Sequence, residues 1–442
     1  MRSTRLRGGL ALAVCAAAAL ALTATFAAGA GQKPALKLGQ GTASATTSVC
    51  GLGNGKKATG KPILLEGIFT LVPGIDFTTI GKVAKAYFDC VNQNGGINGR
   101  RIVYKLYTEQ LKPDAIKALA KKIVEQDHAV GVVGSTSLLD CPVNHSYYES
   151  KGAYAIVAGV PGECFGTSNI AAVNMGPRYS NMGSADALIR QGHIKGTLVV
   201  SSPSAGGIAA YANGGPCLVA KAAGLKCISD AEDLPISDPN ATILKLVQEA
   251  GDGGGVIMDY TAETATSLLQ AAGQQGVVNK VLWGQSTPVA DEATAKIGTA
   301  NGFDGRIYIG QEFNNLATGK PDETLFEKLT HQIGIPAQAF GQMGFLVGKF
   351  ATAALLSIKG PITFKSYNAA VVKLKNQKTD ILCQPWYTGH APLHIPNNID
   401  YTTTPDHGHM VIKEGCIPIS TDEPDIAKVH QIQDADPSLI GK

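Results

Sequence analysis

The sequence has few charged residues, and neither sign is in excess after its first 30 residues. Charged residues make up 17% of the 442, a low share for a cytosolic protein but an ordinary one for an exported protein. Three of the 38 basic residues lie in 1–30, which leaves 35 basic residues against 35 acidic ones. A balanced chain lacks the basic patch that nucleic acids require. We therefore expect no nucleic-acid partner.

The motifs of common enzyme classes are also missing. The chain has neither G-x-S-x-G nor a P-loop, and its glycine-rich run 251–255 precedes a predicted strand, whereas a dinucleotide fingerprint follows one. Four histidines, His390, His394, His407 and His409, fall within twenty residues, but no acidic residue accompanies them at ligand spacing. We predict surface histidines rather than a metal site, and no catalytic residues or cofactor.

Residues 1–30 have the pattern of a signal peptide. Arg2, Arg5 and Arg7 precede an apolar run rich in Ala and Leu, and Ala28-Gly29-Ala30 has the small-x-small form of a cleavage site. The run is short for a membrane span, and we expect no later stretch to be long and apolar enough for one. The alternative of a lipid anchor at Cys15 stays open, although Val14 is bulky for a lipoprotein box.

Export predicts an oxidising destination, and eight cysteines remain beyond Cys15. An even number of cysteines in an exported chain favours disulfides. No C-x-x-C motif supports a zinc site instead. Eight cysteines allow 105 pairings, and pairing of sequence neighbours is the simplest: Cys50–Cys90, Cys141–Cys164, Cys217–Cys227 and Cys383–Cys416.

Short apolar runs alternate with amphipathic runs from residue 62 onward, which predicts βαβ units and parallel sheets. A first set of strands is expected at 63–69, 102–107, 129–133 and 154–158. A second set is expected at 197–201, 227–230, 256–258, 281–283 and 306–309. Helices are expected between them, including one at 183–192, and at 326–333, 337–358 and 367–374. The two halves repeat the same α/β plan.

One stretch, 92–102, reads N-Q-N-G-G-I-N-G-R-R-I and joins a predicted helix to a predicted strand. Its double glycine fits a helix end that needs positive φ, and Asn98-Gly99 fits a tight turn. Together with the run 121–135, which reads K-K-I-V-E-Q-D and then V-G-V-V-G-S, and the order of elements, it resembles the type I periplasmic binding proteins of the Leu/Ile/Val-binding, branched-chain amino acid ABC transporter family.

The resemblance implies two doubly wound lobes joined by three crossings. On it we assign 61–176 plus 311–384 to lobe 1 and 177–310 plus 385–420 to lobe 2. The sequence pattern itself assigns 1–30 to a signal peptide, 31–60 to a flexible linker and 421–442 to a polar tail. The resemblance also implies capture of a solute between the lobes and delivery to an ABC transporter permease. A monomer in the periplasm or at the outer face of the membrane is expected.

Loops at the carboxyl ends of parallel strands converge on one cleft. The expected ligand-binding residues lie on or beside these loops: Thr70, Phe77, Ser135, Thr136, Ser137, Leu138, Gly159, Val160, Pro161, Ala205, Gly206, Tyr260, Thr261, Gln285, Ser286 and Gln311. Hydroxyl residues such as 135–137 fit a helix cap equally well.

The family's amino-acid binders pair the ligand ammonium with an acidic residue, which would fall at Gln285 or Ser286 here. Neither is charged, and a buried ammonium without a counter-charge is costly. We therefore expect an uncharged or acidic organic solute rather than a plain amino acid. Two alternatives remain: an exported ligand sensor of the same fold, and a secreted hydrolase, for which the sequence offers no nucleophile–base pair.

Overall fold

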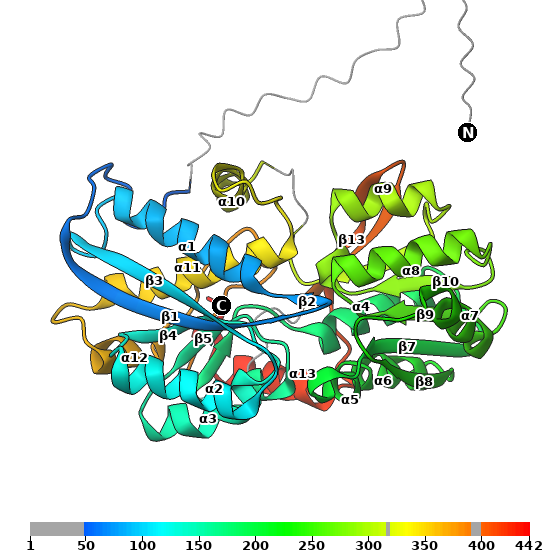
Figure 1. The fold of residues 1–442 in the computed structure, drawn as a ribbon, viewed down its shortest axis with the longest axis horizontal. Helices are drawn as coiled ribbons and strands as arrows, with labels where there is room; N and C mark the ends of the chain where they lie inside the picture. Colours follow the sequence, from blue (N-terminus) through cyan, green and yellow to red (C-terminus); the bar gives the residue numbers. More distant parts are fainter. Residues whose placement is uncertain (1–47, 315–318, 390–398) are drawn as a thin grey trace, which may run out of the picture. The chain divides into compact units, whose positions relative to one another are not determined.

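The computed structural model describes residues 48–314, 319–389 and 399–442, and within them the chain forms two α/β lobes (Figure 1). The sheet of lobe 1 has the order β2-β1-β4-β5-β6, with β3 also paired to β1, and only the β1–β2 pair is antiparallel. Its strands are β1 Gly60–Val72, β2 Ile75–Asp76, β3 Arg100–Glu109, β4 Gly131–Ser135, β5 Ala155–Val157 and β6 Ile170–Ala172.

Helices cover both faces of this first sheet (Figure 1). One face is covered by α1 Thr78–Gln93, α10 Pro321–Gln332 and α11 Ala339–Ser357. The other is covered by α2 Pro113–Lys121, the π-helical turn Lys122–Gln126 and α3 Asp140–Ser150. Helix α12 Phe364–Val371 packs against α11 and β4. Both faces are therefore buried, as a parallel sheet requires.

The second sheet has the order β13-β12-β11-β10-β9-β7-β8, parallel from β11 to β8 and antiparallel at β12 and β13. Its strands are β7 Thr197–Pro203, β8 Lys226–Glu232, β9 Gly255–Met258, β10 Leu282–Gln285, β11 Ile307–Gln311, β12 Ile399–Asp406 and β13 His409–Pro418. Its helices are α4 Pro177–Arg190, α5 Ile208–Ala212 and α6 Gly214–Ala222, then α7 Pro239–Ala250, α8 Ala262–Gln274 and α9 Glu292–Ala300. The predicted fold class, two doubly wound lobes, is confirmed.

The stretch 92–102 has the predicted local geometry. Helix α1 ends at Gln93, and Gly96 has φ +57°. A Cβ at Gly96 would lie 2.2 Å from the carbonyl oxygen of Arg100, so only glycine fits there. The Asn92 side chain donates to the carbonyl of Ile102 at 2.8 Å and accepts from its N–H at 2.7 Å. This stretch therefore fixes the step from α1 to β3.

The structure contains the four disulfides that neighbour pairing predicts. Cys50–Cys90 attaches the segment before β1 to α1, and Ala58 N–H donates to the carbonyl of Asn92 at 2.7 Å. The described part of the predicted linker, 48–59, is thus held against lobe 1, while 31–47 lies outside the described residues. Cys383–Cys416 joins the end of lobe 1 to β13 of lobe 2.

Three expectations about the C-terminal part need correction. The segment from 421 is no polar tail, because α13 Pro424–Ala435 buries Ile426 and Val429 against α4. Residues up to Gly389 stay with lobe 1, since Trp386 belongs to its core, so the third crossing comes later than 384. Helix α11 is long and apolar enough to span a membrane, contrary to expectation, but it is mostly buried in lobe 1.

Two elements around the first crossing differ from the sequence reading. Strand β6 was not predicted, because three residues give no detectable periodicity. Helix α4 was expected at 183–192 and begins at Pro177 instead. Proline at the first helical position was the available signal. The earlier start matters, because it brings the first turn of α4 to the site described next.

Candidate functional site

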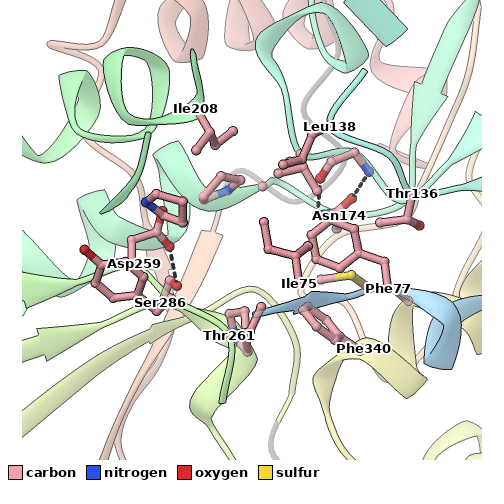
Figure 2. A pocket seen from close by; sticks show the side chains of 18 of the residues that line it. Ile75, Phe77, Thr136, Leu138, Asn174, Ile208, Asp259, Thr261, Ser286 and Phe340 are labelled. Carbon is pink, nitrogen blue, oxygen red and sulfur yellow. Dashed lines mark hydrogen bonds between the residues drawn. The ribbon is translucent and has the colours of Figure 1, made fainter. Parts of the chain in front are cut away.

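A partly open cavity lies between the two lobes, at the carboxyl ends of the parallel strands (Figure 2). The space open to the centre of a water molecule is about 80 Å³. Its walls are mostly apolar, and no Lys, Arg, His or Cys is among the described lining residues. Those residues are Ile75, Phe77, Thr136, Leu138, Gly159, Val160, Asn174, Gly176, Pro177, Pro203, Ile208, Asp259, Tyr260, Thr261, Ser286, Pro288, Glu312, Phe340 and Met343.

Half of the sixteen residues expected at the ligand line this cavity. They are Phe77, Thr136, Leu138, Gly159, Val160, Tyr260, Thr261 and Ser286. The other eight lie off its wall: Thr70, Ser135, Ser137, Pro161, Ala205, Gly206, Gln285 and Gln311. The strand-end rule therefore located the region, but it could not tell which side chain of each loop points inward.

The hydroxyl groups expected at the ligand in lobe 1 mostly make hydrogen bonds to other groups of the protein. The Ser137 hydroxyl donates to the buried carboxylate of Glu109 at 2.9 Å and accepts the N–H groups of Leu139 and Asp140, which caps α3. Thr70 also donates to Glu109, and Ser135 accepts the N–H of Ile68 at 3.1 Å. Hydrogen bonds within the protein therefore account for all three hydroxyl groups.

The remaining off-wall residues are also held by local packing. Gln285 is fully buried, and neither atom of its side-chain amide has a hydrogen-bond partner among the described residues. Gln311 is the last residue of β11, and its side chain is buried. A Cβ at Gly206 would lie 3.3 Å from Leu138, so this glycine contacts the cavity wall from behind. Pro161 and Ala205 begin short 3-10 turns.

Asp259, at the end of β9, is an acidic group in the wall that we did not expect as a ligand contact. One carboxylate oxygen accepts from Ser286 at 2.5 Å (Figure 2), and the other accepts from Ser202 at 3.2 Å. Burial raises the pKa of Asp259, while hydrogen bonds from Ser286, Asn181 and Ser202 oppose that rise. Gln285 and Ser286 are uncharged, but Asp259 places an acidic group in the wall beside Ser286.

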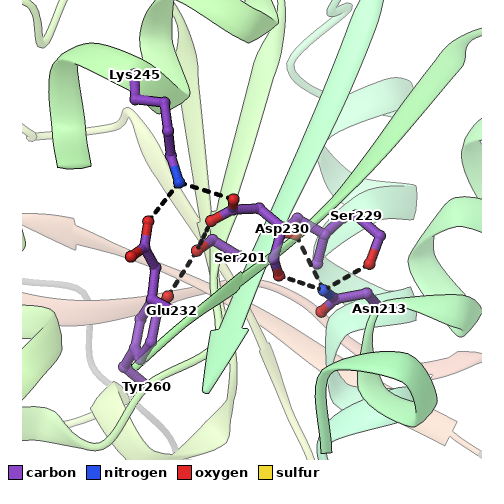
Figure 3. Close-up of polar contacts among 8 residues, drawn as sticks. Ser201, Asn213, Ser229, Asp230, Glu232, Lys245 and Tyr260 are labelled. Carbon is purple, nitrogen blue, oxygen red and sulfur yellow. Dashed lines mark hydrogen bonds and ion pairs between the residues drawn. The ribbon is translucent and has the colours of Figure 1, made fainter. Parts of the chain in front are cut away.

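Tyr260 presents its ring to the cavity because a polar chain holds its hydroxyl behind the wall (Figure 3). The hydroxyl lies 2.6 Å from the Ser201 oxygen, which donates to Asp230 at 2.7 Å. Lys245 pairs with Asp230 at 2.8 Å and also with Glu232. The hydroxyl of Ser201 thus orients an aromatic wall residue rather than a ligand.

Glu312 is a second unexpected carboxyl, placed where the chain leaves β11 for lobe 1. Its Oε2 accepts the backbone N–H groups of Met175 and Gly176, at 2.5 and 2.6 Å, in the segment that runs from β6 to α4. Burial raises the pKa of Glu312 to about 7, against the lowering effect of these N–H groups and of Thr287. This carboxyl therefore changes charge near neutral pH.

The raised pKa of Glu312 predicts a pH-dependent stability that E312Q removes. A folded pKa near 7, against an ordinary 4.5, favours folding at low pH, and this contribution is lost as pH rises through 7. From pH 5 to 8, wild type should lose about 2–3 kcal/mol of unfolding free energy relative to E312Q. Urea titrations at both pH values measure this, and parallel profiles for the two proteins would contradict it.

The lobes also touch at the cavity rim. The hydroxyl of Thr261, the residue before α8, donates to the carbonyl of Gly74 between β1 and β2 at 2.8 Å. The Leu234 side chain of lobe 2 approaches the same glycine. These contacts close one side of the cavity, so the structure shows the lobes together. A hinge at the crossings would separate them.

Of the histidines weighed as metal ligands, His390 and His394 lie outside the described residues. His407 lies with Asp304 and Asp406, and their ligand atoms come within 4.8 Å of one another. The group is at the surface of lobe 2, away from the cavity, and two of its members are exposed. Exposed acidic groups of this kind are common without an ion, so we assign it no role.

A comparison with protein families matches residues 74–397 to the family described as periplasmic binding protein. The chain belongs to this family. As a periplasmic binding protein, it is of a class that binds small molecules outside the cytoplasm and works with ABC transporter permeases. No curated protein sequence matches this periplasmic binding protein.

Solved structures share the fold of this periplasmic binding protein at low sequence identity. A branched chain amino acid ABC transporter protein from Thermus thermophilus, with bound valine, has a TM-score of 0.70 and 12% identity over 85% of this chain and 100% of its own. A fatty acid ABC transporter substrate-binding protein from Thermomonospora curvata has a TM-score of 0.69 and 16% identity over 84% of this chain and 96% of its own. A solute binding protein from R. palustris in complex with benzoate has a TM-score of 0.66 and 17% identity over 82% of this chain and 98% of its own.

Proposed function

We propose that this periplasmic binding protein captures one small, largely apolar organic molecule between its lobes and delivers it to an ABC transporter permease. The observation that carries the proposal is the cavity between the lobes, whose walls come from both lobes and are mostly apolar. Capture in such a cavity excludes water and favours the closed arrangement of the lobes. We further propose that the protein is exported, acts as a monomer and has no enzyme activity.

The polar groups of the wall favour an uncharged or cationic solute. Asp259 and Glu312 both face the cavity, and its described lining includes no basic side chain. A carboxylate would therefore be desolvated next to two acidic groups, without a counter-charge. Hydroxyls that could donate to it in lobe 1, such as Ser137, already bind Glu109. These features disfavour an acidic solute and a zwitterionic amino acid alike.

A matched series of benzylamine, benzyl alcohol, benzoate and leucine tests this proposal by thermal shift. Ligand binding to the folded state raises the melting midpoint. We expect benzylamine and benzyl alcohol to raise it, and benzoate and leucine to leave it unchanged. The two benzyl probes should bind at 1:1 in calorimetry. Stronger stabilisation by benzoate or leucine would contradict the solute class but not capture itself. If none of the four shifted the midpoint, the proposed solute class would fail.

A further inference from the structure

Glu312 connects two of the crossings between the lobes at the cavity wall. It directly follows β11, on the segment that leads back to lobe 1, where Asn314 N–H donates to the Ile381 carbonyl at 2.8 Å. Its carboxyl accepts two N–H groups from 175–176, on the segment that leads from lobe 1 to α4. One side chain therefore holds together the backbone of the first and second passages between the lobes.

The backbone of Glu312 is also anchored to lobe 2. The N–H of Glu312 donates to the Thr287 hydroxyl at 3.1 Å, and Thr287 lies 2.9 Å from the Ser180 hydroxyl of α4. Glu312 also lines the cavity beside Asn174 and Gly176. A change in the charge of this carboxyl would therefore alter its interaction with a bound solute and its hydrogen bonds to residues 175–176.

The titratable groups around Glu312 are few. Asp259 and Tyr260 line the same cavity, and the lining residues of α11, Phe340 and Met343, are uncharged. In the first turn of α4, the Arg178 guanidinium pairs with Glu423 at 2.8 Å. Asp259 is therefore the one other carboxyl among the described lining residues, and any pH effect on binding must be divided between these two.

We propose that Glu312 is a positioning residue of the solute site, whose ionised carboxylate joins the two crossings and receives a cationic solute, so that binding releases a proton. This rests on the proposed function. The carboxylate accepts N–H groups more strongly when ionised, because a charged acceptor makes the stronger hydrogen bond. A cation in the cavity adds to that preference for the ionised form. The closed, loaded protein should therefore hold Glu312 deprotonated.

Calorimetry with benzylamine from pH 6 to pH 8 tests the linkage, since the probe stays protonated over this range. With a pKa near 7 in the empty protein, binding should tighten about tenfold between pH 6 and pH 8. At pH 7, about half a proton should be released per bound molecule, which buffers of different ionisation enthalpy would reveal. Benzyl alcohol, which has no charge, should show no such tightening.

Two variants locate the effect. E312Q keeps one oxygen that can accept the N–H groups of Met175 and Gly176, and its affinity for benzylamine should not depend on pH. D259N should bind benzylamine more weakly and keep the pH dependence. If the affinity of E312Q for benzylamine still rose with pH, or if only D259N lost that pH dependence, the role of Glu312 would be overturned. Measurable benzylamine binding without any slope in wild type overturns the proton linkage and leaves solute capture intact. Absence of binding by every probe would instead contradict the proposed solute class, and the linkage with it.

Discussion

Reducing all four disulfides is expected to unfold the protein at room temperature. The bridges close separate loops, with sequence separations of 40, 23, 10 and 33 residues. Each loop of this size restricts the unfolded chain enough to contribute about 3–4 kcal/mol. Because the loops do not overlap in sequence, the contributions should nearly add. Their sum rivals the whole stability of a typical protein, about 5–15 kcal/mol.

The measurement is thermal denaturation of the secreted protein with and without reductant, followed by circular dichroism. Thiol titration of the unreduced protein, in denaturant, should find none of the eight cysteines free. Paired Cys→Ser variants, one bridge at a time, separate the four contributions, and C217S/C227S should cost least because its loop is shortest. An unchanged melting midpoint in a sample shown to have eight free thiols would refute the prediction.

Replacing Trp386 by alanine should give the largest effect of a single substitution in the core of lobe 1. Its ring stacks on Phe350, with centroids 4.3 Å apart and planes at 2°, and its Nε1 donates to the Ala172 carbonyl at 2.8 Å. The residue is fully buried. Removing it leaves a cavity and an unpaired carbonyl, so we expect a loss of about 4 kcal/mol in unfolding free energy.

Urea denaturation by circular dichroism measures this loss. W386F keeps the stacked ring but not the N–H donor, and it should cost about 1–2 kcal/mol. L244A removes an exposed side chain on α7 and should change stability little. A cost for W386A no larger than that for L244A would show that the stacked ring contributes little to folding.

The two-lobed fold was predictable from the sequence because its signals are local. The stretch 92–102 needs glycine at Gly96 and an amide at Asn92, and both requirements are visible in the sequence. The alternation of short apolar strands with helices predicts the βαβ units and the parallel sheets. The failures are where local signals are weak: three-residue β6, and α13, whose apolar residues are few enough to be taken for a polar tail.

The candidate site was predictable only as a region. Parallel strands end at one edge, so the loops at 136–138, 159–160 and 259–261 could be named in advance. Which side chains of those loops face the cavity depends on partners distant in sequence, as Glu109 and Ser137 show. Glu312 was missed because its role depends on a contact with Met175, 137 residues away. The hydrophobic periodicity of a sequence carries no information about a contact between residues so far apart.

The disulfide Cys383–Cys416 turns the last passage between the lobes into a covalent ring. A protease that cut the backbone once anywhere between these two cysteines would open the ring without releasing a piece. The strand β13 and helix α13, which follow the cut in sequence, would stay attached through sulfur. Limited digestion should therefore show one band on a non-reducing gel and two after reduction. The C-terminal segment would thus remain attached to the rest of the protein even with this passage broken.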